Sequence, residues 1–306
     1  KDVVIIGGGH NGLVAATYLA KAGKSVVILE ANEEIGGATA SVRVFPEFDA
    51  HLSRYSYLVA LLPDQIVSDL GLNFVTVPRT VSSYTPDLNG TGLYISRQWD
   101  QTTADSFASI PDGEADAAAW QQFYGEVAKF AERIAPYMLQ PLKSRSELKA
   151  AIDLPEIWEY LIEAPIGEII NARFKSDLVK GVVLTDALIG THASADDLLA
   201  NICFLYHLIG NGTGEWKVPK GGMGALVIEL ERVAREAGVE IRTNCKVTAI
   251  DSQSDSVTAT IENGDQFVAS HLLSNAAPQV LAKLRDKPKP ASLSGAQFKI
   301  NMLLKK

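Results

Sequence analysis

Lys1-Asp-Val-Val-Ile-Ile-Gly-Gly-Gly-His-Asn-Gly12 is the stretch of this 306-residue chain that decides its fold. The apolar run 3–6 predicts a short strand that is buried on both faces. Gly7, Gly9 and Gly12 then match the pattern GxGxxG between a strand and a helix, which is the context that the pattern requires. Such a turn brings the backbone close to a pyrophosphate, so the stretch predicts a dinucleotide-binding site.

The next residues complete a βαβ unit. We expect a helix over 11–22, a stop at Gly23 and a second buried strand over 26–29. The N-terminus of that helix offers unpaired N–H groups and a partial positive charge to phosphates. Glu30 ends the second strand, 18 residues after Gly12. A carboxylate at this place accepts hydrogen bonds from both ribose hydroxyls of an adenosine and repels a 2′-phosphate.

A second glycine pair distinguishes between two dinucleotides. Gly36-Gly37 follows Glu30 by six and seven residues. Together with the first motif, it resembles the extended signature of the glutathione-reductase-type flavoproteins, in which a loop approaches the flavin-side phosphates. The combination favours FAD over NAD as the cofactor. We expect FAD contacts from Gly7, Gly8, Gly9, Asn11, Gly12, Glu30, Ala31, Gly36, Gly37 and Ala38.

The middle of the chain has a different character. The β-prone runs 74–77 and 93–96 flank the turn-rich stretch 87–92 and predict an antiparallel hairpin. Residues 114–207 read as mostly helical. One apolar stripe there recurs at three- and four-residue spacing, which is typical of a helix face turned to a core. The stripe consists of Trp120, Phe123, Val127, Phe130 and Ile134.

An α/β pattern returns near Lys217. The glycine-rich run 221–224 opens a helix that Gly238 ends. Strands are expected over 240–242, 247–250, 257–261 and 266–273. Asn263-Gly264 predicts a hairpin between the last two of these strands. Residues 298–304 read as one more strand.

These patterns together predict an α/β fold. Its main part is a Rossmann-like FAD-binding domain, made of a parallel sheet plus a β-meander, and a mixed α+β substrate domain is inserted into it. We assign residues 1–72 to the first part of the FAD-binding domain and 73–215 to the inserted hairpins and helices. Residues 216–285 then form the second part of the FAD-binding domain, and 286–306 start a return to the substrate domain.

Composition excludes several other functions. The chain is 47% hydrophobic with a net charge of −8, which argues against nucleic-acid binding. No apolar stretch approaches the roughly 20 residues that cross a bilayer, and no signal peptide is visible, so we expect a cytoplasmic location. Cys203 and Cys245 are 42 residues apart and predict no redox disulfide. The histidines have no ligand spacing, so no metal is expected.

Blocks along the whole chain carry a more specific resemblance. They are Ile6-Gly-Gly-Gly-His-Asn-Gly-Leu-Val-Ala-Ala16, Phe45-Pro-Glu-Phe48, Ser53-Arg-Tyr-Ser-Tyr57, Trp216-Lys-Val-Pro-Lys-Gly-Gly-Met-Gly224, Lys246-Val-Thr-Ala-Ile250 and Leu273-Ser-Asn-Ala-Ala-Pro278. These blocks resemble the phytoene-desaturase-related flavoproteins. Within that group, the resemblance is closest to the branch called pyridine nucleotide-disulfide oxidoreductase domain-containing protein 2.

The resemblance implies further features of the site. The backbone of Val247 would contact the adenine ring of FAD, and residues 53–57 would lie near the isoalloxazine ring. Members of the wider amine-oxidase group often carry Arg directly after the glycine pair, where this chain has Ala38. One charged phosphate contact is therefore missing or comes from elsewhere. We expect the family's C-terminal glycine-rich segment, which closes over the flavin, in sequence beyond Lys306.

The resulting hypothesis is an FAD-dependent oxidoreductase that acts on C–H or C=C bonds of an apolar, polyene or lipid-like small molecule. No residue is singled out as catalytic, and the oligomeric state and contact with a membrane surface stay open. Two alternatives also stay open: an NAD-dependent dehydrogenase built on the same βαβ unit, and a non-catalytic flavoprotein scaffold for protein interaction.

Overall fold

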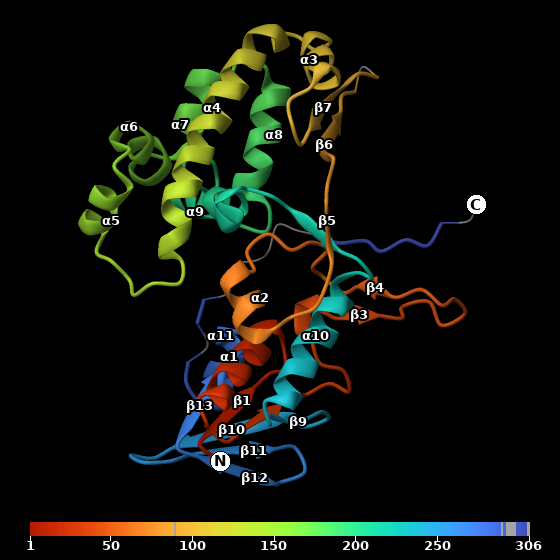
Figure 1. Cartoon of the computed structure of the whole chain (residues 1–306), viewed down its shortest axis with the longest axis vertical. Helices are drawn as coiled ribbons and strands as arrows, with labels where there is room; N and C mark the ends of the chain where they lie inside the picture. Colours follow the sequence, from red (N-terminus) through yellow and green to blue (C-terminus); the bar gives the residue numbers. More distant parts are fainter. Residues whose placement is uncertain (89, 289, 292–297, 305–306) are drawn as a thin grey trace.

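The computed structural model describes residues 1–88, 90–288, 290–291 and 298–304. Its elements form an α/β body, which carries both the N-terminal strand and the last helix, and a largely helical body stacked on it along the long axis (Figure 1). Buried apolar residues form three clusters. One cluster consists of residues between 93 and 209, and the other two combine residues from 3–72 with residues from 223–284.

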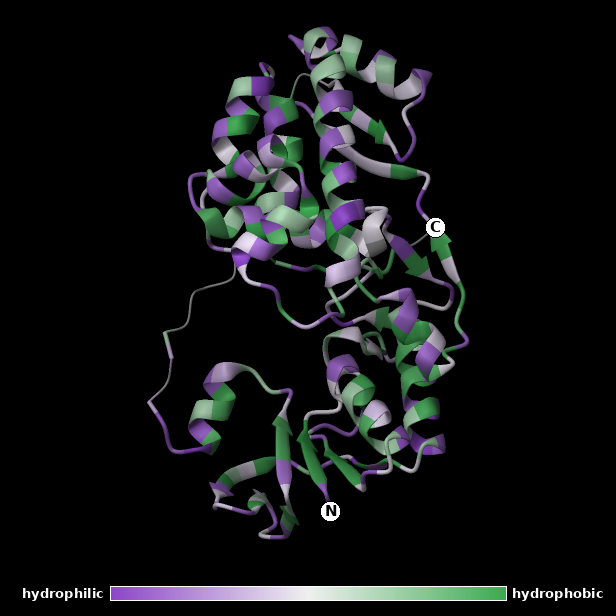
Figure 2. Ribbon diagram, turned by 60° about the vertical axis from the view of Figure 1, so that its left-hand side comes forward, coloured by the Kyte–Doolittle hydropathy of each residue, from purple (hydrophilic) through white to green (hydrophobic). Residues whose placement is uncertain are grey.

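A four-stranded parallel sheet forms the centre of the α/β body, in the order β13-β1-β2-β9. Its strands are β1 (Val3–Ile6), β2 (Val26–Leu29), β9 (Glu240–Arg242) and β13 (His271–Ser274). Every residue of β1 and β2 is buried, because both faces of the sheet are covered. The green strands near the N-terminus in Figure 2 show this apolar composition.

Alternate residues of these strands point to opposite faces of the sheet. Val3 and Ile5 pack with residues of helices α1 (His10–Lys21) and α10 (Met223–Glu236). Val4 and Ile6 pack against a three-stranded antiparallel meander on the other face. The meander consists of β10 (Val247–Ser252), β11 (Val257–Ile261) and β12 (Gln266–Ala269). The parallel sheet and the meander that the sequence predicted are thus both present.

Helix α4 (Gly113–Ile134) organises the helical body. Its apolar stripe is confirmed: Phe123 and Phe130 are fully buried, and Ile134 packs against the same core. The other helices there are α3 (Gln101–Ala108), α5 (Arg145–Ile152), α6 (Pro155–Trp158), α7 (Ile166–Arg173), α8 (Asp177–Leu188) and α9 (Leu198–Ile209), with a π-helical turn at Glu159–Glu163.

The remaining elements are short. They are α2 (Asp64–Leu70), α11 (Pro278–Leu284), β3 (Ser41–Val42), β4 (Leu52–Ser53), β5 (Thr76–Pro78), β6 (Val81–Pro86), β7 (Gly92–Ser96) and β8 (Lys217–Pro219), and the 3-10 turns Gly37–Thr39, Ala135–Tyr137 and Gly210–Gly212. Antiparallel pairing joins β3 with β4, β5 with β8 and β6 with β7.

The hairpin in the middle region uses a different first strand from the one that the sequence predicted. Residues 93–96 do form part of β7, but β7 pairs with β6 and not with residues 74–77. Ser82, Ser83 and Thr85 make β6 more polar than the run 74–77, so its apolar signal is weak. Part of the region 74–77 belongs to β5, and β5 pairs with β8. The paired residues Pro78 and Lys217 are 139 positions apart in the sequence.

Two other strand predictions were also wrong. The single strand expected over 266–273 is divided at Ser270, so that β12 joins the meander and β13 joins the parallel sheet. Residues 298–304 form no strand in the described structure. Their contact with β4 is made by side chains, because Lys299 Nζ and Asn301 Nδ2 both donate to the Ser53 carbonyl, at 2.7 and 3.3 Å.

The buried amide of Asn201 on α9 holds the turn between the π-helical segment and α7. It accepts the Ile166 N–H at 3.0 Å and donates to the carbonyls of Leu161 and Ala164 at 3.1 and 2.9 Å. We expect Asn201→Leu to lower the free energy of unfolding by about 3 kcal/mol, because it strands several buried backbone groups.

Urea denaturation measures this effect. Ile202→Ala is the control on the same helix, since Ile202 is 65% exposed and should change the free energy of unfolding by less than about 0.5 kcal/mol. Equal stability of the two variants would contradict the role given to the Asn201 amide.

Candidate cofactor site

The turn after β1 is built for close backbone approach. Gly7 has a φ of +96°, a conformation that side chains rarely adopt. A Cβ on Gly12 would lie 2.4 Å from the Gly7 carbonyl oxygen, so only glycine lets α1 start this near the strand. Gly9 is the N-cap residue of α1, with extended backbone at φ −72°.

The N-terminus of α1 presents unpaired backbone donors. No described side chain caps it, and its first turn contains no acidic residue. Its first N–H groups have no acceptor within the helix and carry the positive end of the helix dipole. Asn11 lies exposed on this turn, and burial lowers the pKa of His10, so its imidazole is neutral at pH 7. Such a helix end suits a phosphate.

Glu30 closes the other side of the turn. Its carboxylate is only 6% exposed. Oε2 accepts the Gly8 N–H at 2.8 Å, and Oε1 accepts the N–H and the amide of Asn32 at 2.9 and 2.7 Å. A carboxylate has about four lone pairs, so capacity for a hydroxyl remains on Oε2, and a rotation of the Asn32 amide would free a second place.

The second glycine pair meets the first. The Gly36 N–H donates to the Gly8 carbonyl at 2.8 Å, and Gly9 and Gly36 form a parallel bridge. A Cβ on Gly36 would lie 2.8 Å from a Val227 methyl group of α10, and one on Gly37 would lie 3.3 Å from Gly9 Cα. Two glycine loops therefore face each other without side chains between them.

Residues near the two glycine loops follow in order. Ala38 is exposed after Gly37, and its carbonyl accepts the N–H groups of Tyr55 and Ser56 at 3.3 and 3.0 Å. Ala38 therefore lies directly beside segment 53–57, the segment expected near the isoalloxazine ring.

At the other end of the row of expected FAD-contact residues, Glu30 and Ala31 lie next to the start of β10. Exposed Ala31 follows Glu30, and the Cys245 N–H donates to the Glu30 carbonyl at 2.8 Å. Val247, 8% exposed, begins β10 two residues later. The eleven residues expected to contact FAD thus lie along one path from Val247, past Glu30 and the glycine loops, to Ala38. Their individual roles stay predictions.

Two residues near this path were missed by sequence reasoning. Asn275 follows β13, and its amide lies beside the first glycine turn: Nδ2 would be 3.0 Å from a Cβ on Gly9 and 3.2 Å from one on Gly12. Its place at the carboxyl end of a strand next to β1 is a usable signal, but only once β13 is known to pair with β1.

Lys299 is the second of these residues. Its ammonium donates to the carbonyls of Ser53 and Tyr55 at 2.7 and 2.9 Å, and desolvation lowers its pKa. A cation is thereby fixed on segment 53–57.

The arrangement fits a dinucleotide. A hydroxyl acceptor at Glu30, a backbone cradle that any Cβ would fill and an uncapped helix end match a ribose and a pyrophosphate in that order. Among the described residues, no three His, Cys, Asp or Glu side chains are grouped for a metal ion. The described helices also include none long and apolar enough to cross a membrane. The fold and the site define a dinucleotide-binding protein of the flavoprotein type.

The chain belongs to a flavoprotein family. The family described as flavin containing amine oxidoreductase matches residues 12–303, and FAD is the cofactor of this chain. Among solved structures, wild-type putrescine oxidase bound to putrescine has a TM-score of 0.60 at 19% identity, covering 94% of this chain and 61% of that one. That similarity confirms the α/β fold predicted from the sequence.

Curated relatives extend over nearly the whole chain. An uncharacterized protein of Mycobacterium tuberculosis is 40% identical over 100% of this chain and 59% of its own length. Pyridine nucleotide-disulfide oxidoreductase domain-containing protein 2 of Mus musculus is 31% identical over 91% and 54%, which confirms the branch indicated by the sequence blocks. The 4,4'-diaponeurosporene oxygenase of Staphylococcus aureus (strain MRSA252) is 25% identical over 90% and 55%. The chain thus spans somewhat more than half the length of these relatives.

The glycine geometry predicts the behaviour of a Gly9→Val variant. The new Cβ would meet only the end of the Asn275 side chain within 3 Å, so the protein should fold. The valine would project where the pyrophosphate approaches, so bound FAD should fall by at least about tenfold.

Visible absorbance of the purified protein and FAD released on denaturation measure the loss. Gly125→Ala on α4, where an added Cβ meets nothing within 4 Å, is the control and should keep its flavin. If Gly9→Val kept its full flavin content, the assignment of the FAD site to this turn would be wrong.

A titratable group outside the cofactor site is expected to make the free energy of unfolding depend on pH. Burial raises the pKa of Asp186 on α8 to about 6, although His207 and Arg79 oppose the shift. A carboxyl whose folded-state pKa is raised contributes full stability below its unfolded pKa and loses it as the pH rises through 6. Asp186→Asn should therefore raise the free energy of unfolding by about 2 kcal/mol at pH 8 and by almost nothing at pH 4.

Urea denaturation at the two pH values tests this expectation. Asp177→Asn on the same helix is the control, because the Asp177 side chain is 97% exposed. A gain for Asp186→Asn that is the same at pH 4 and pH 8 would show that charge burial is not its cause.

Proposed function

We propose that this chain is the cofactor-bearing part of an FAD-dependent oxidoreductase that acts on C–H or C=C bonds of an apolar, polyene or lipid-like small molecule. FAD, when bound, supplies the redox chemistry by accepting the hydrogen equivalent from the substrate. The protein holds the cofactor, presents the substrate to it and excludes water.

The apolar surface beside segment 53–57 carries this proposal. Tyr55 and Tyr57 are 65% and 50% exposed on a segment that is hydrogen-bonded to Ala38 at the end of the cofactor path. Lys299 joins the segment to residues 298–304, where Phe298 and Ile300 on either side of it are 87% and 65% exposed. Exposed aromatic and aliphatic side chains gathered at one place indicate a binding surface for an apolar molecule.

Lys299 is a positioning residue in this proposal. Its two hydrogen bonds hold the Ser53 and Tyr55 carbonyls together and fix the backbone that carries the exposed tyrosines. The ammonium also places one positive charge beside the flavin end of the cofactor path, where Ala38 provides none.

The name of one relative supports the substrate class. The Staphylococcus aureus protein is named as an oxygenase of 4,4'-diaponeurosporene, and we extend that kind of substrate to this chain. The two free cysteines, Cys203 and Cys245, agree with a reaction in the reducing cytoplasm.

The two alternatives make different predictions for purified protein. An NAD-dependent dehydrogenase, which the flavin family match disfavours, would be colourless and would gain no flavin absorbance with added FAD. A flavoprotein scaffold would hold FAD that no candidate substrate reduces. The facing glycine pairs at Gly9 and Gly36 favour FAD, because the second pair has no part in a plain NAD site.

Anaerobic reduction tests the proposed function. We expect the FAD-loaded protein to lose its oxidised-flavin absorbance when mixed with a long-chain or polyene substrate, and to keep it when mixed with putrescine. Lys299→Met should retain FAD but slow the reduction by about tenfold, since it releases segment 53–57.

Glu262→Gln, an exposed change in the meander away from segment 53–57, is the control and should reduce at the unaltered rate. If only putrescine reduced the flavin, the proposal of an apolar substrate would be wrong and an amine would take its place.

A further inference from the structure

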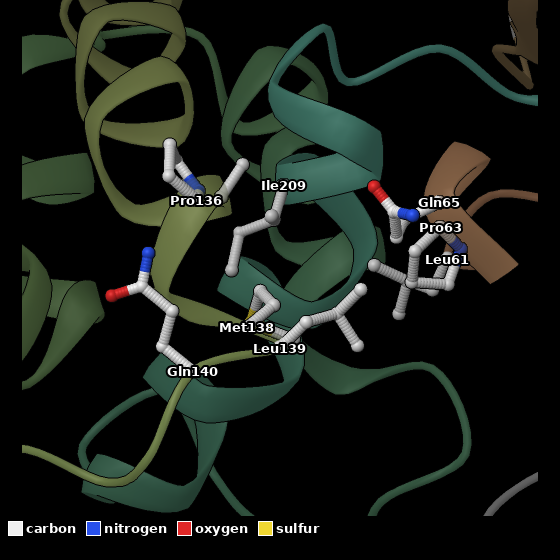
Figure 3. Close-up of a pocket in the computed structure, with 9 residues that line it drawn as sticks. Leu61, Pro63, Gln65, Pro136, Met138, Leu139, Gln140 and Ile209 are labelled. Carbon is white, nitrogen blue, oxygen red and sulfur yellow. The ribbon is translucent and has the colours of Figure 1, made fainter. Parts of the chain in front are cut away.

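A separate cavity opens between the two bodies of the protein. Its volume is about 340 Å³, within the range of small-molecule sites. Its lining comes from the segment leading into α2, from the turn after α4 and from the end of α9 (Figure 3). The lining residues are Leu61, Pro63, Gln65, Ala135, Pro136, Met138, Leu139, Gln140 and Ile209.

The lining contains no charge. Seven of the nine described residues that line the cavity are aliphatic, proline or methionine, and the other two are the neutral amides Gln65 and Gln140. Figure 3 shows these two amides at opposite sides of the apolar group formed by Leu61, Leu139 and Ile209. An ammonium or a carboxylate bound there would lose its hydration without gaining a counter-charge.

The same lining argues for a flexible aliphatic occupant. The described residues that line the cavity include no aromatic ring against which a flat ring system could stack. Met138 is an unbranched, adaptable side chain that fits irregular apolar shapes. Next to the cavity, Met138 and Leu139 are 53% and 52% exposed and Leu142 is fully exposed. Three exposed apolar side chains within five residues are a local apolar patch at the cavity.

Along the chain, the cavity follows closely on the segment expected near the flavin. Leu61 lies four residues after Tyr57, and between them Val59 is fixed by two hydrogen bonds to Lys217, at 2.8 and 3.0 Å. The backbone that leads from Leu61 to the exposed tyrosines of segment 53–57 is therefore held in place at Val59.

We infer that this cavity binds the hydrocarbon chain of the substrate. The inference rests on the proposed function and makes it more specific: the ligand is a long uncharged chain, and Leu61, Met138 and Leu139 contact its methylene or methine groups. A saturated chain and a conjugated polyene share this chemistry, and the probes below separate them.

Calorimetry with 1-alkanols of increasing length tests the site on the whole chain loaded with FAD. Affinity should rise by about fourfold for each added methylene group and then stop rising once the cavity is full. Dodecylamine should bind at least about tenfold more weakly than 1-dodecanol, because its ammonium finds no counter-charge. Retinol is the polyene probe, and its affinity against that of 1-dodecanol shows which kind of chain the cavity prefers.

Two matched variants locate the binding. Leu139→Glu places a charge in the lining at a half-exposed position that tolerates it, and should weaken 1-dodecanol binding by at least about tenfold. Leu142→Glu makes the same change three residues later, at a fully exposed side chain outside the lining, and should leave the affinity within about twofold. Thermal unfolding of both proteins verifies that they are folded.

A third variant keeps the test independent of charge. Leu61→Trp fills part of the cavity, so the affinity should stop rising at a shorter alkanol than in the parent protein. Equal weakening by both glutamates, no effect of either glutamate, or tight binding of dodecylamine would overturn the inference. Dimers that dissociate only in Leu139→Glu would also overturn it, by showing that a second copy covers the cavity.

Flavin reduction separates this inference from the proposed function. Alkanol binding that depends on Leu139, without reduction by any substrate, would leave the cavity assignment standing and reject the proposed activity. Reduction that is unaltered in Leu139→Glu would keep the activity and reject the cavity.

Discussion

The hydrogen bond from the Gly8 N–H to the buried carboxylate of Glu30 is the contact on which the cofactor region depends. It joins the turn after β1 to the end of β2. The carbonyl of the same residue, Gly8, accepts the Gly36 N–H and so joins the second glycine loop to this turn. Both loops need to lack side chains, because Gly36 is pressed against Val227 and Gly12 against the Gly7 carbonyl. The Glu30 carboxylate already accepts several N–H donors, so a hydroxyl donor extends an existing pattern.

The proposed substrate side is assembled from parts that are distant along the chain. Segment 53–57 is hydrogen-bonded to the Ala38 carbonyl, and Lys299, from residues 298–304, donates to the carbonyl of Tyr55 in that segment. The same segment continues past Val59 to the cavity under the turn after α4. Local backbone geometry therefore builds the cofactor end, and contacts between distant parts of the chain build the proposed substrate end. This difference explains why the first end has a motif with a fixed spacing, whereas the second was indicated only by the resemblance of block 53–57.

Much of the α/β body was predictable, because its signals are local. Strands β1 and β2, the start of α1, and Glu30 and the glycine pairs follow from patterns within 37 residues. The apolar stripe of α4 was equally visible. The failures involve partners rather than propensities. The apolar run 74–77 was predicted to pair with 93–96, but the more polar strand β6 pairs with those residues. Asn275 and Lys299 act across 268 and 246 residues, and no spacing rule covers such distances.

The antiparallel pair β5 and β8 has a consequence for how this molecule can diversify. Pro78 is opposite Lys217 in that pair, so the polypeptide leaves for the helical body and returns from it about 5 Å apart. Topologically, everything between those two positions is the loop of one long hairpin. The segment between the two strands can be exchanged for another one, because the two ends of a replacement need only lie close to each other. Recombination at this point can therefore replace the helical body and leave the nucleotide cradle unaltered.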